Sequence, residues 1–292
     1  MKRRAFLQNA AVVVTPLLLP HTFDVLSSTS LCAYAKRNVV FVHLNGGNDG
    51  YNTIVPHTDK AYYKLRPNIA VQPTEVIRLT ERYGFHPSLA GLKPWYDQGN
   101  MLIVPNATSA NLDNSHHTCF HAWKNLLVKP LTTYPLDQKQ IIEFSAADLG
   151  LAASDFEEKL LNIASSISTH QQRHVYAIGL DGFDTHQFQK VKHAFLLQAY
   201  ADAMNTFMNR LKALDELNNT MIITWSEFGR SLAENNRKGT DHGHAGVLMI
   251  YGGQLQHSGI YSNQETNASG AFDVSTVYAN ILGTWLGGVL QA

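Results

Sequence analysis

The chain has 292 residues, of which 45% are hydrophobic and 16% are charged. This composition excludes a disordered protein and supplies enough apolar residues for a substantial core. Lysine plus arginine and aspartate plus glutamate number 23 each, so the chain has no basic excess that would favour nucleic acid as a partner.

Residues 1–35 have the features of an export signal. The charged start MKRRAFLQ precedes the apolar stretch NAAVVVTPLLLP, and Ala33, Tyr34 and Ala35 form an A-x-A cleavage signal. The paired arginines predict the twin-arginine route, with an ordinary secretory signal as the alternative. The apolar stretch is short and contains two prolines, so we expect a periplasmic or otherwise exported protein with no transmembrane anchor after cleavage.

Five apolar runs rich in valine and isoleucine predict buried strands. They cover residues 38–44, 101–105, 174–180, 221–225 and 247–252. Helical patterns lie between or after them, at residues 87–98, 153–167, 188–217 and 273–287. Strands that alternate with helices predict an α/β protein with a mostly parallel sheet covered on both faces.

The longest helical pattern, residues 188–217, has apolar residues at helical spacing, and we expect them to face the core. They are Val191, Phe195, Tyr200, Met204, Phe207, Leu211 and Leu214. We treat residues 36–292 as a single domain, in which residues 129–170 form either a reduced cap or a crossover.

Polar residues gather at one end of each predicted strand. They are Asp49 after the first strand, Ser115 after the second, Asp181, Asp184 and His186 after the third, Glu227 and Arg230 after the fourth, and His242 and His244 before the fifth. Ligands of open α/β sheets bind outside the carboxyl ends of the strands, so this distribution predicts a functional site at one edge of the sheet.

Each of these groups also has a structural interpretation. The GGNDG segment around Asp49 is a tight-turn sequence, and Ser115 suits a helix N-cap. Glu227 and Arg230 suit a surface salt bridge. Taken together, carboxylates and imidazoles form the ligand set of divalent metals. A hydroxyl beside such a metal is a plausible nucleophile, and a nearby arginine suits a phosphate or sulfate group.

Several motifs in chain order resemble domain-of-unknown-function family 1501. They include HLNGGNDGYNTIVP, SHHTCFHAW, GLDGFDTH, TWSEFGRSLAENN and GTDHGHAGVLMIYGG. That family is similar to the alkaline phosphatase and sulfatase superfamily. The resemblance implies a three-layer α/β/α sandwich of the alkaline phosphatase type, with a metal site at the strand ends.

The same resemblance implies roles for individual residues. Ser115 falls at the position of the nucleophile, and Asp49 at that of the aspartate that binds the nearest metal. Either Asp181 or Asp184, together with His186, resembles the Asp-and-His pair of a second metal. Either His242 or His244 resembles the histidine that completes that site. Glu227 stands for the aspartate of an Asp-His-Gly motif.

Phe228 departs from the family pattern, because it occupies the position of the histidine in that motif and a phenylalanine cannot bind a metal. We therefore expect either one ion or two ions of unequal affinity. Zn²⁺ is the first candidate, and Mn²⁺, Fe, Ca²⁺ and Mg²⁺ are alternatives.

Two functions follow as hypotheses. The first is an exported, metal-dependent hydrolase of phosphate or sulfate esters, in which Ser115 attacks a small anionic ester and Arg230 holds its anionic group. The second is a non-catalytic binding or scaffold protein with a periplasmic partner, which keeps the fold and a structural metal. Phe228 and the short stretch between Trp123 and His174 favour the second hypothesis.

Overall fold

The computed structural model describes most of the chain after the predicted signal. The described residues are 37–108, 150–170, 174–243, 246–255, 257–261 and 272–273, and the single positions 116, 118 and 285. The predicted export signal, Ser115, His244, residues 129–149 and most of the predicted last helix therefore lie outside the described residues.

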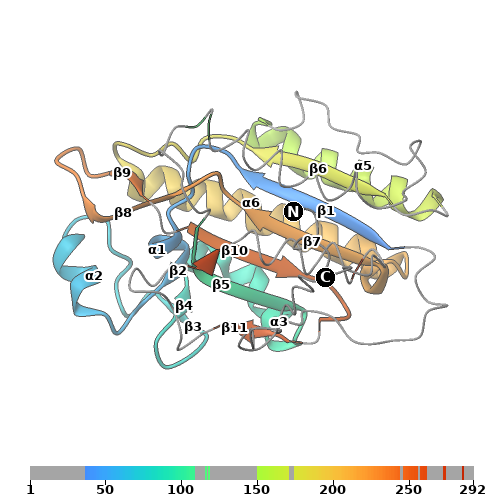
Figure 1. Ribbon diagram of the computed structural model, residues 1–292, viewed down its shortest axis with the longest axis horizontal. Helices are drawn as coiled ribbons and strands as arrows, with labels where there is room; N and C mark the ends of the chain where they lie inside the picture. Colours follow the sequence, from blue (N-terminus) through green and yellow to red (C-terminus); the bar gives the residue numbers. More distant parts are fainter. Residues whose placement is uncertain are drawn as a thin grey trace, which may run out of the picture.

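A central sheet runs through the molecule in the strand order β11-β5-β10-β7-β1-β6 (Figure 1). Its strands are β1 (Asn38–Leu44), β5 (Met101–Thr108), β6 (Val175–Leu180), β7 (Thr220–Trp225), β10 (Gly246–Tyr251) and β11 (Gly259–Ile260), with β12 (Phe272–Asp273) beside β5. All five predicted strands are present.

The sheet is mostly parallel but contains one reversed strand. β1 pairs in parallel with both β6 and β7, whereas β10 runs antiparallel to β7 and β5. The beginning of β10 therefore lies at the same sheet edge as the ends of β1, β5, β6 and β7. This reversal brings the polar residues before β10 to the edge where the other strands end.

Both faces of the sheet are buried. Val40 and Val42 on one face of β1 and Val39 and Phe41 on the other are at most 1% exposed. Such near-continuous apolar strands are typical of sheets covered on both sides. The α/β fold class with a mostly parallel central sheet is confirmed.

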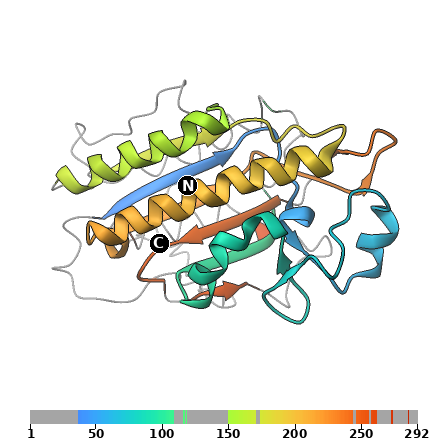
Figure 2. The same ribbon diagram turned by 180° about the vertical axis from the view of Figure 1, so that it is seen from behind.

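Two long helices cover one face of the sheet. They are α5 (Ala153–Thr169) and α6 (Gln189–Ala213), and they lie side by side over the sheet in Figure 2. Phe156, Leu160, Tyr200 and Phe207 extend from them into the core. The described part of the uncertain segment 129–170 thus belongs to the layer that covers the sheet.

The prediction for the longest helix was only partly correct. Its later apolar residues, from Tyr200 to Leu211, are buried, but Val191 and Phe195 are exposed to solvent. Gln189, His193 and Leu197 in the same turns are buried, so Val191 and Phe195 lie on the solvent-facing side of a helix whose other side packs against the core.

Short elements complete the described fold. They are α1 (Gly50–Thr53), β2 (Ile54–Val55), α2 (Lys60–Leu65), β3 (Ile77–Arg78), β4 (Gly84–Phe85), the 3₁₀ helix η2 (Pro87–Leu92), α3 (Lys93–Asp97), η4 (Leu217–Asn219), β8 (Gly229–Glu234) and β9 (Thr240–Gly243). β8 and β9 form a hairpin beyond the end of β7 (Figure 1). Among the described residues, no helix has the length and apolar character needed to cross a bilayer.

Candidate metal centre

Four side chains converge at the carboxyl edge of the sheet. Nε2 of His186 lies 3.0 Å from Nε2 of His242 and 3.1 Å from Oδ1 of Asp184. The same oxygen is 3.5 Å from Nε2 of His242 and 3.9 Å from Nε2 of His116. These four residues are called the histidine cluster below.

The cluster is assembled from three separate chain segments. Asp184 and His186 follow β6, His242 lies on β9, and His116 lies beyond the end of β5. On the β8–β9 hairpin, His242 of β9 is paired with Arg230 of β8. This pairing holds His242 at the cluster. The DGFDTH motif thus supplies two of the four side chains.

A buried carboxylate orients His116. Oε1 of Glu227 lies 2.8 Å from Nδ1 of His116, and Oε2 lies 2.9 Å from Nε2 of His43. Because an ionised carboxylate only accepts hydrogen bonds, Nδ1 of His116 donates and Nε2 is left facing the cluster. Burial raises the pKa of Glu227, but the hydrogen bonds from the two histidines outweigh it and hold the pKa far below its usual range.

Glu227 also acts on the charge of His116. The hydrogen bond from the ring to Glu227 raises the pKa of His116, against the opposing effect of burial. Glu227 itself is 2% exposed and accepts from the amide of Gly46 at 2.8 Å. Both of its oxygens are therefore occupied, so the structure places it behind His116 rather than among the converging ligand atoms as expected from the sequence.

A second carboxylate stands behind His186. Oδ1 of Asp241 lies 3.4 Å from Nδ1 of His186 and accepts from the side-chain amide of Asn235 at 3.1 Å. Two of the three cluster histidines therefore have a carboxylate at Nδ1 and direct Nε2 inward. This arrangement of carboxylate, histidine and metal recurs in protein metal sites, where it fixes the ring tautomer and orientation.

The donor set of the cluster fits a divalent ion. Three imidazole nitrogens and one carboxylate oxygen suit Zn²⁺ and related metals. Ligand atoms bound at about 2.0–2.1 Å in a tetrahedron stand about 3.3 Å apart, and four of the spacings in the cluster lie between 3.0 and 3.9 Å. Ligand atoms of His116, Asp184 and His242 all lie within 4.8 Å of one another.

Phe228 forms an apolar wall of the cluster. Its ring centroid lies 4.7 Å from that of His116 and 4.3 Å from that of His242. On another side the Phe228 ring packs closely against Gly47, whose φ is +80°, since a β-carbon at Gly47 would meet the ring at 2.2 Å. The phenylalanine at this motif position therefore packs against two ligand candidates, which limits the directions that their rings can take.

Arg230, predicted to hold the anionic group of a substrate, is buried in the structure and bonded to the surrounding loops. It is 1% exposed, and its guanidinium donates to the carbonyls of Gly47, Gly46, Thr240 and Phe183. It also donates to Oδ1 of Asp184 at 2.6 Å. Burial raises the pKa of Asp184, but Arg230 outweighs this effect and lowers it. Arg230 thus joins the loops that carry the cluster, and these bonds leave it no free face for a substrate anion.

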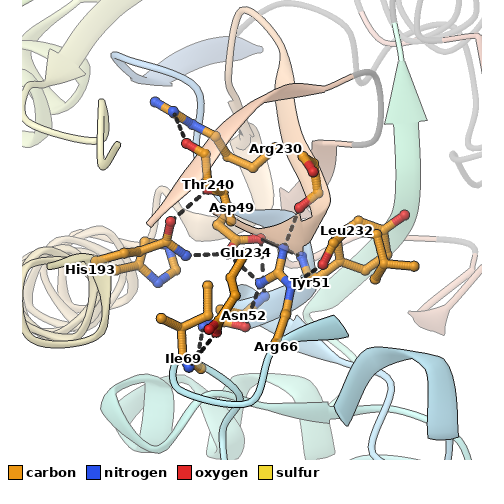
Figure 3. Close-up of polar contacts among 12 residues, drawn as sticks. Asp49, Tyr51, Asn52, Arg66, Ile69, His193, Arg230, Leu232, Glu234 and Thr240 are labelled. Atoms are coloured by element: carbon orange, nitrogen blue, oxygen red, sulfur yellow. Dashed lines mark hydrogen bonds and ion pairs between the residues drawn. The ribbon is translucent and has the colours of Figure 1, made fainter. Parts of the chain in front are cut away.

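Asp49 likewise lies in a buried ion pair instead of the cluster (Figure 3). Arg66 donates to Oδ2 at 2.5 Å and to Oδ1 at 3.0 Å, and Gln189 also donates to Oδ2. The amides of Tyr51 and Asn52 donate to Oδ1, which caps α1. Burial raises the pKa of Asp49, yet Arg66 and these donors hold it below its ordinary value. Donors occupy both oxygens, so we leave Asp49 out of the ligand set.

The other predicted residues fall in different places. Asp181 is exposed and accepts from Asn45 at 3.1 Å, outside the group of converging ligand atoms. Of the paired alternatives, the structure therefore brings Asp184 and His242 into the cluster. Ser115 and His244 lie outside the described residues.

The sequence assigned no role in the site to His116 or Asp241. His116 directly follows Ser115 in the SHH motif, and Asp241 directly precedes His242 in TDHGH. The signal for both was their position beside predicted site residues.

A family model described as "Protein of unknown function (DUF1501)" matches residues 157–288. This segment includes Asp184, His186, Glu227 and His242. The family resemblance expected from the motifs is therefore confirmed over that range. No curated protein matches the sequence.

Several solved structures are weakly similar to this chain, and the first two described here have alkaline-phosphatase-like folds. The lipoteichoic acid synthase LtaP from Listeria monocytogenes is 10% identical, with 80% of this chain and 71% of that chain covered and a TM-score of 0.41. The periplasmic domain of EcEptC from Escherichia coli, in complex with Zn, is 8% identical, with 78% and 76% covered and a TM-score of 0.40. The protein Ps i-CgsB is 13% identical, with 48% of this chain and 35% of that chain covered and a TM-score of 0.36.

Proposed function

We propose that this protein is an exported, metal-dependent hydrolase of phosphate or sulfate esters, with a single divalent ion held by the histidine cluster. The observation that carries the proposal is the convergence of Nε2 of His116, His186 and His242 on Oδ1 of Asp184, at distances of 3.1–3.9 Å. Zn²⁺ is the ion that this donor set suits best.

The surrounding residues support a site that is held ready for the ion. Glu227 and Asp241 orient two of the histidines, and Arg230 keeps Asp184 ionised beside them. The Asp184 side chain is 48% exposed and that of His116 is 43% exposed. The cluster therefore opens to solvent on one side, as a site that admits a substrate must.

Bound at this position, a divalent ion would act as a Lewis acid toward an ester oxygen and lower the pKa of an adjacent hydroxyl. Ser115 is the candidate for that hydroxyl because it directly precedes His116 in the chain. Arg230 is committed to internal hydrogen bonds, so within the described part of the site the ion is the group that would bind the anionic end of the ester.

The experiment is a panel of phosphate and sulfate monoesters and diesters assayed with metal-loaded protein. Wild type and Ser115→Ala are compared at equal metal content. The proposal predicts turnover in the wild type and a loss of at least about a hundredfold in the variant, the scale on which nucleophilic groups contribute. Turnover that persists in Ser115→Ala would contradict the nucleophile assignment.

The second candidate is a binding protein that uses the ion structurally. The specific observation in its favour is that Asp49 and Arg230, two residues expected to serve the reaction, make only internal contacts in the described structure. In that case, chelation lowers the melting temperature, because a structural ion contributes free energy of folding. No ester in the panel is then turned over by either protein.

A further inference from the structure

The first two turns of α6 carry exposed apolar side chains on one face. Phe188, Val191 and Phe195 are 66%, 77% and 64% exposed. Among the described residues, they are three of the four large hydrophobic side chains in solvent, the fourth being Leu65 on α2. Val191 and Phe195 are four residues apart in α6 and therefore lie on the same side of the helix, and Phe188 is the N-cap residue that directly precedes it. These three residues are called the apolar stripe.

The backbone of Phe188 indicates that this exposure is not incidental. Its φ is +50° and its ψ +38°, a left-handed conformation that is unfavourable for a bulky side chain. Its amide donates to the carbonyl of Arg237 at 3.1 Å, which holds the turn in place. The exposed ring adds little to the core, so folding stability does not explain an aromatic residue here.

Basic side chains surround the stripe. Lys190 and Lys192 precede and follow Val191, which places them about 100° to either side of it on the helix. Arg237 and Lys238 lie in the turn between β8 and β9, and the amide of Gln189 donates to the carbonyl of Lys238 at 2.9 Å. All four side chains are exposed. Figure 2 shows the first turns of α6 beside this hairpin.

We propose that this surface, the apolar stripe with its four flanking cations, docks on an anionic lipid bilayer. Exposed aromatic and aliphatic residues on a helix bordered by lysine and arginine are the pattern of helices that lie in the membrane interface. The apolar side chains enter the boundary between headgroups and acyl chains, and the cations contact anionic headgroups. Charge complementarity selects this occupant, because an uncharged apolar partner would gain nothing from the four cations.

Docking in this way sets the position of the histidine cluster. His186 lies two residues before Phe188 in the chain, so the cluster is held close to the bilayer surface. The inference does not rest on the proposed hydrolase function, because the residues of the stripe and its cations are outside the cluster. A variant that cannot hold a metal, such as His242→Ala, is expected to bind bilayers like the wild type.

The test is flotation of the full chain with two kinds of vesicle, phosphatidylcholine alone and phosphatidylcholine with about one third phosphatidylglycerol. The wild type should bind the anionic vesicles more strongly, and the difference should shrink as salt is added. The double variant Phe188→Ser/Phe195→Ser should lower the partition constant at least about tenfold. Lys190→Gln/Lys192→Gln should lower it about twenty-five-fold, at about fivefold for each charge.

Two matched controls lie elsewhere on the molecule. Arg210→Gln/Lys212→Gln removes the same charge from the other end of α6, about 30 Å away, and Leu65→Ser removes the remaining exposed apolar side chain. Both should bind like the wild type. The N-terminal apolar stretch is common to every variant, so differences between variants report on α6. All altered side chains are exposed, and circular dichroism confirms that the variants fold.

Equal binding to neutral and anionic vesicles would overturn the proposal, as would stripe variants that bind like the controls. Sedimentation velocity adds a second decisive outcome. A wild-type dimer that Phe195→Ser dissociates, with no binding to anionic vesicles, would assign the stripe to a second copy of this chain and reject the bilayer as its occupant.

Discussion

Nδ1 of His116 lies 2.8 Å from Oε1 of Glu227, a carboxylate that is almost completely buried. The other oxygen of Glu227 contacts His43, which is stacked on Trp225 at 4.2 Å between ring centroids. The ring of His116 is therefore positioned by groups that belong to the core of the sheet. This connection is the reason to treat the histidine cluster as a built site and not as a chance gathering of polar side chains.

The first prediction tests this connection. Glu227→Gln keeps the shape of the side chain but removes its charge, so it should lower metal affinity by about 10–100-fold. A competition titration against a chromophoric chelator measures the affinity. Glu234→Gln is the control, since Glu234 bonds to the amides of Asn68 and Ile69 and is not part of the cluster. Equal affinities in the two variants would contradict the orienting role of Glu227.

The second prediction separates Asp49 from the metal. Arg66→Met leaves a buried, uncompensated carboxylate and should lower the free energy of unfolding by about 3–5 kcal/mol. Asp49→Asn/Arg66→Met should be less destabilised than the sum of the single variants, because the two side chains are paired. Denaturant titration measures both effects. Metal content should be unchanged in Asp49→Asn, and a loss of metal without loss of stability would restore Asp49 as a ligand.

The third prediction concerns the close approach of two loops. Gly46 has φ +115°, and a β-carbon there would meet the backbone nitrogen of Asp184 at 2.3 Å. Gly46→Ala should therefore destabilise the protein by more than about 1 kcal/mol and weaken metal binding. Gly91→Ala is the matched control, since a β-carbon at Gly91 has nothing within 4 Å. Similar effects of the two substitutions would show that the loop contact has no bearing on the site.

The fourth prediction is a dependence of stability on pH. Burial lowers the pKa of His193 from 6.5 to about 3, so the unfolded chain binds a proton in this window that the folded chain does not. The contribution of His193 is fully present above pH 6.5 and is lost as the pH falls toward 3, with a slope of up to about 1.4 kcal/mol per unit.

His193→Gln should therefore show a shallower loss of stability between pH 6.5 and 4 than the wild type. Denaturant titrations at a series of pH values measure it. The exposed His170, replaced by glutamine, is the control and should leave the slope unchanged. An unchanged slope in His193→Gln would mean that this imidazole is protonated in the folded protein.

The strands were predictable because their signal is local. The apolar runs of β1, β6 and β7 are buried on both faces, and a nearly continuous stretch of valine and isoleucine indicates this directly. The same rule predicted polar residues meeting at one edge of the sheet, and the structure brings Asp184, His186 and His242 together there.

The roles of Asp49 and Arg230 were not predictable, because they depend on contacts between distant segments. Arg66 reaches Asp49 from a loop 17 residues further along the chain, and Arg230 bonds to carbonyls of residues about 180 positions earlier. A carboxylate after a strand has the same sequence pattern whether an arginine or a metal neutralises it. Val191 and Phe195 were mispredicted because, at about 100° per residue, they lie on the opposite side of the helix from Tyr200, and their apolar character alone suggested a buried position.

The central claim is that the histidine cluster holds a divalent ion, and elemental mass spectrometry on the purified protein tests it most directly. Wild type, His242→Ala and the control His170→Ala are compared after exhaustive dialysis. The account predicts about one equivalent of Zn²⁺ or a related ion in the wild type and the control, and its loss in His242→Ala. No bound metal in the wild type, or an equal amount in His242→Ala, would contradict it.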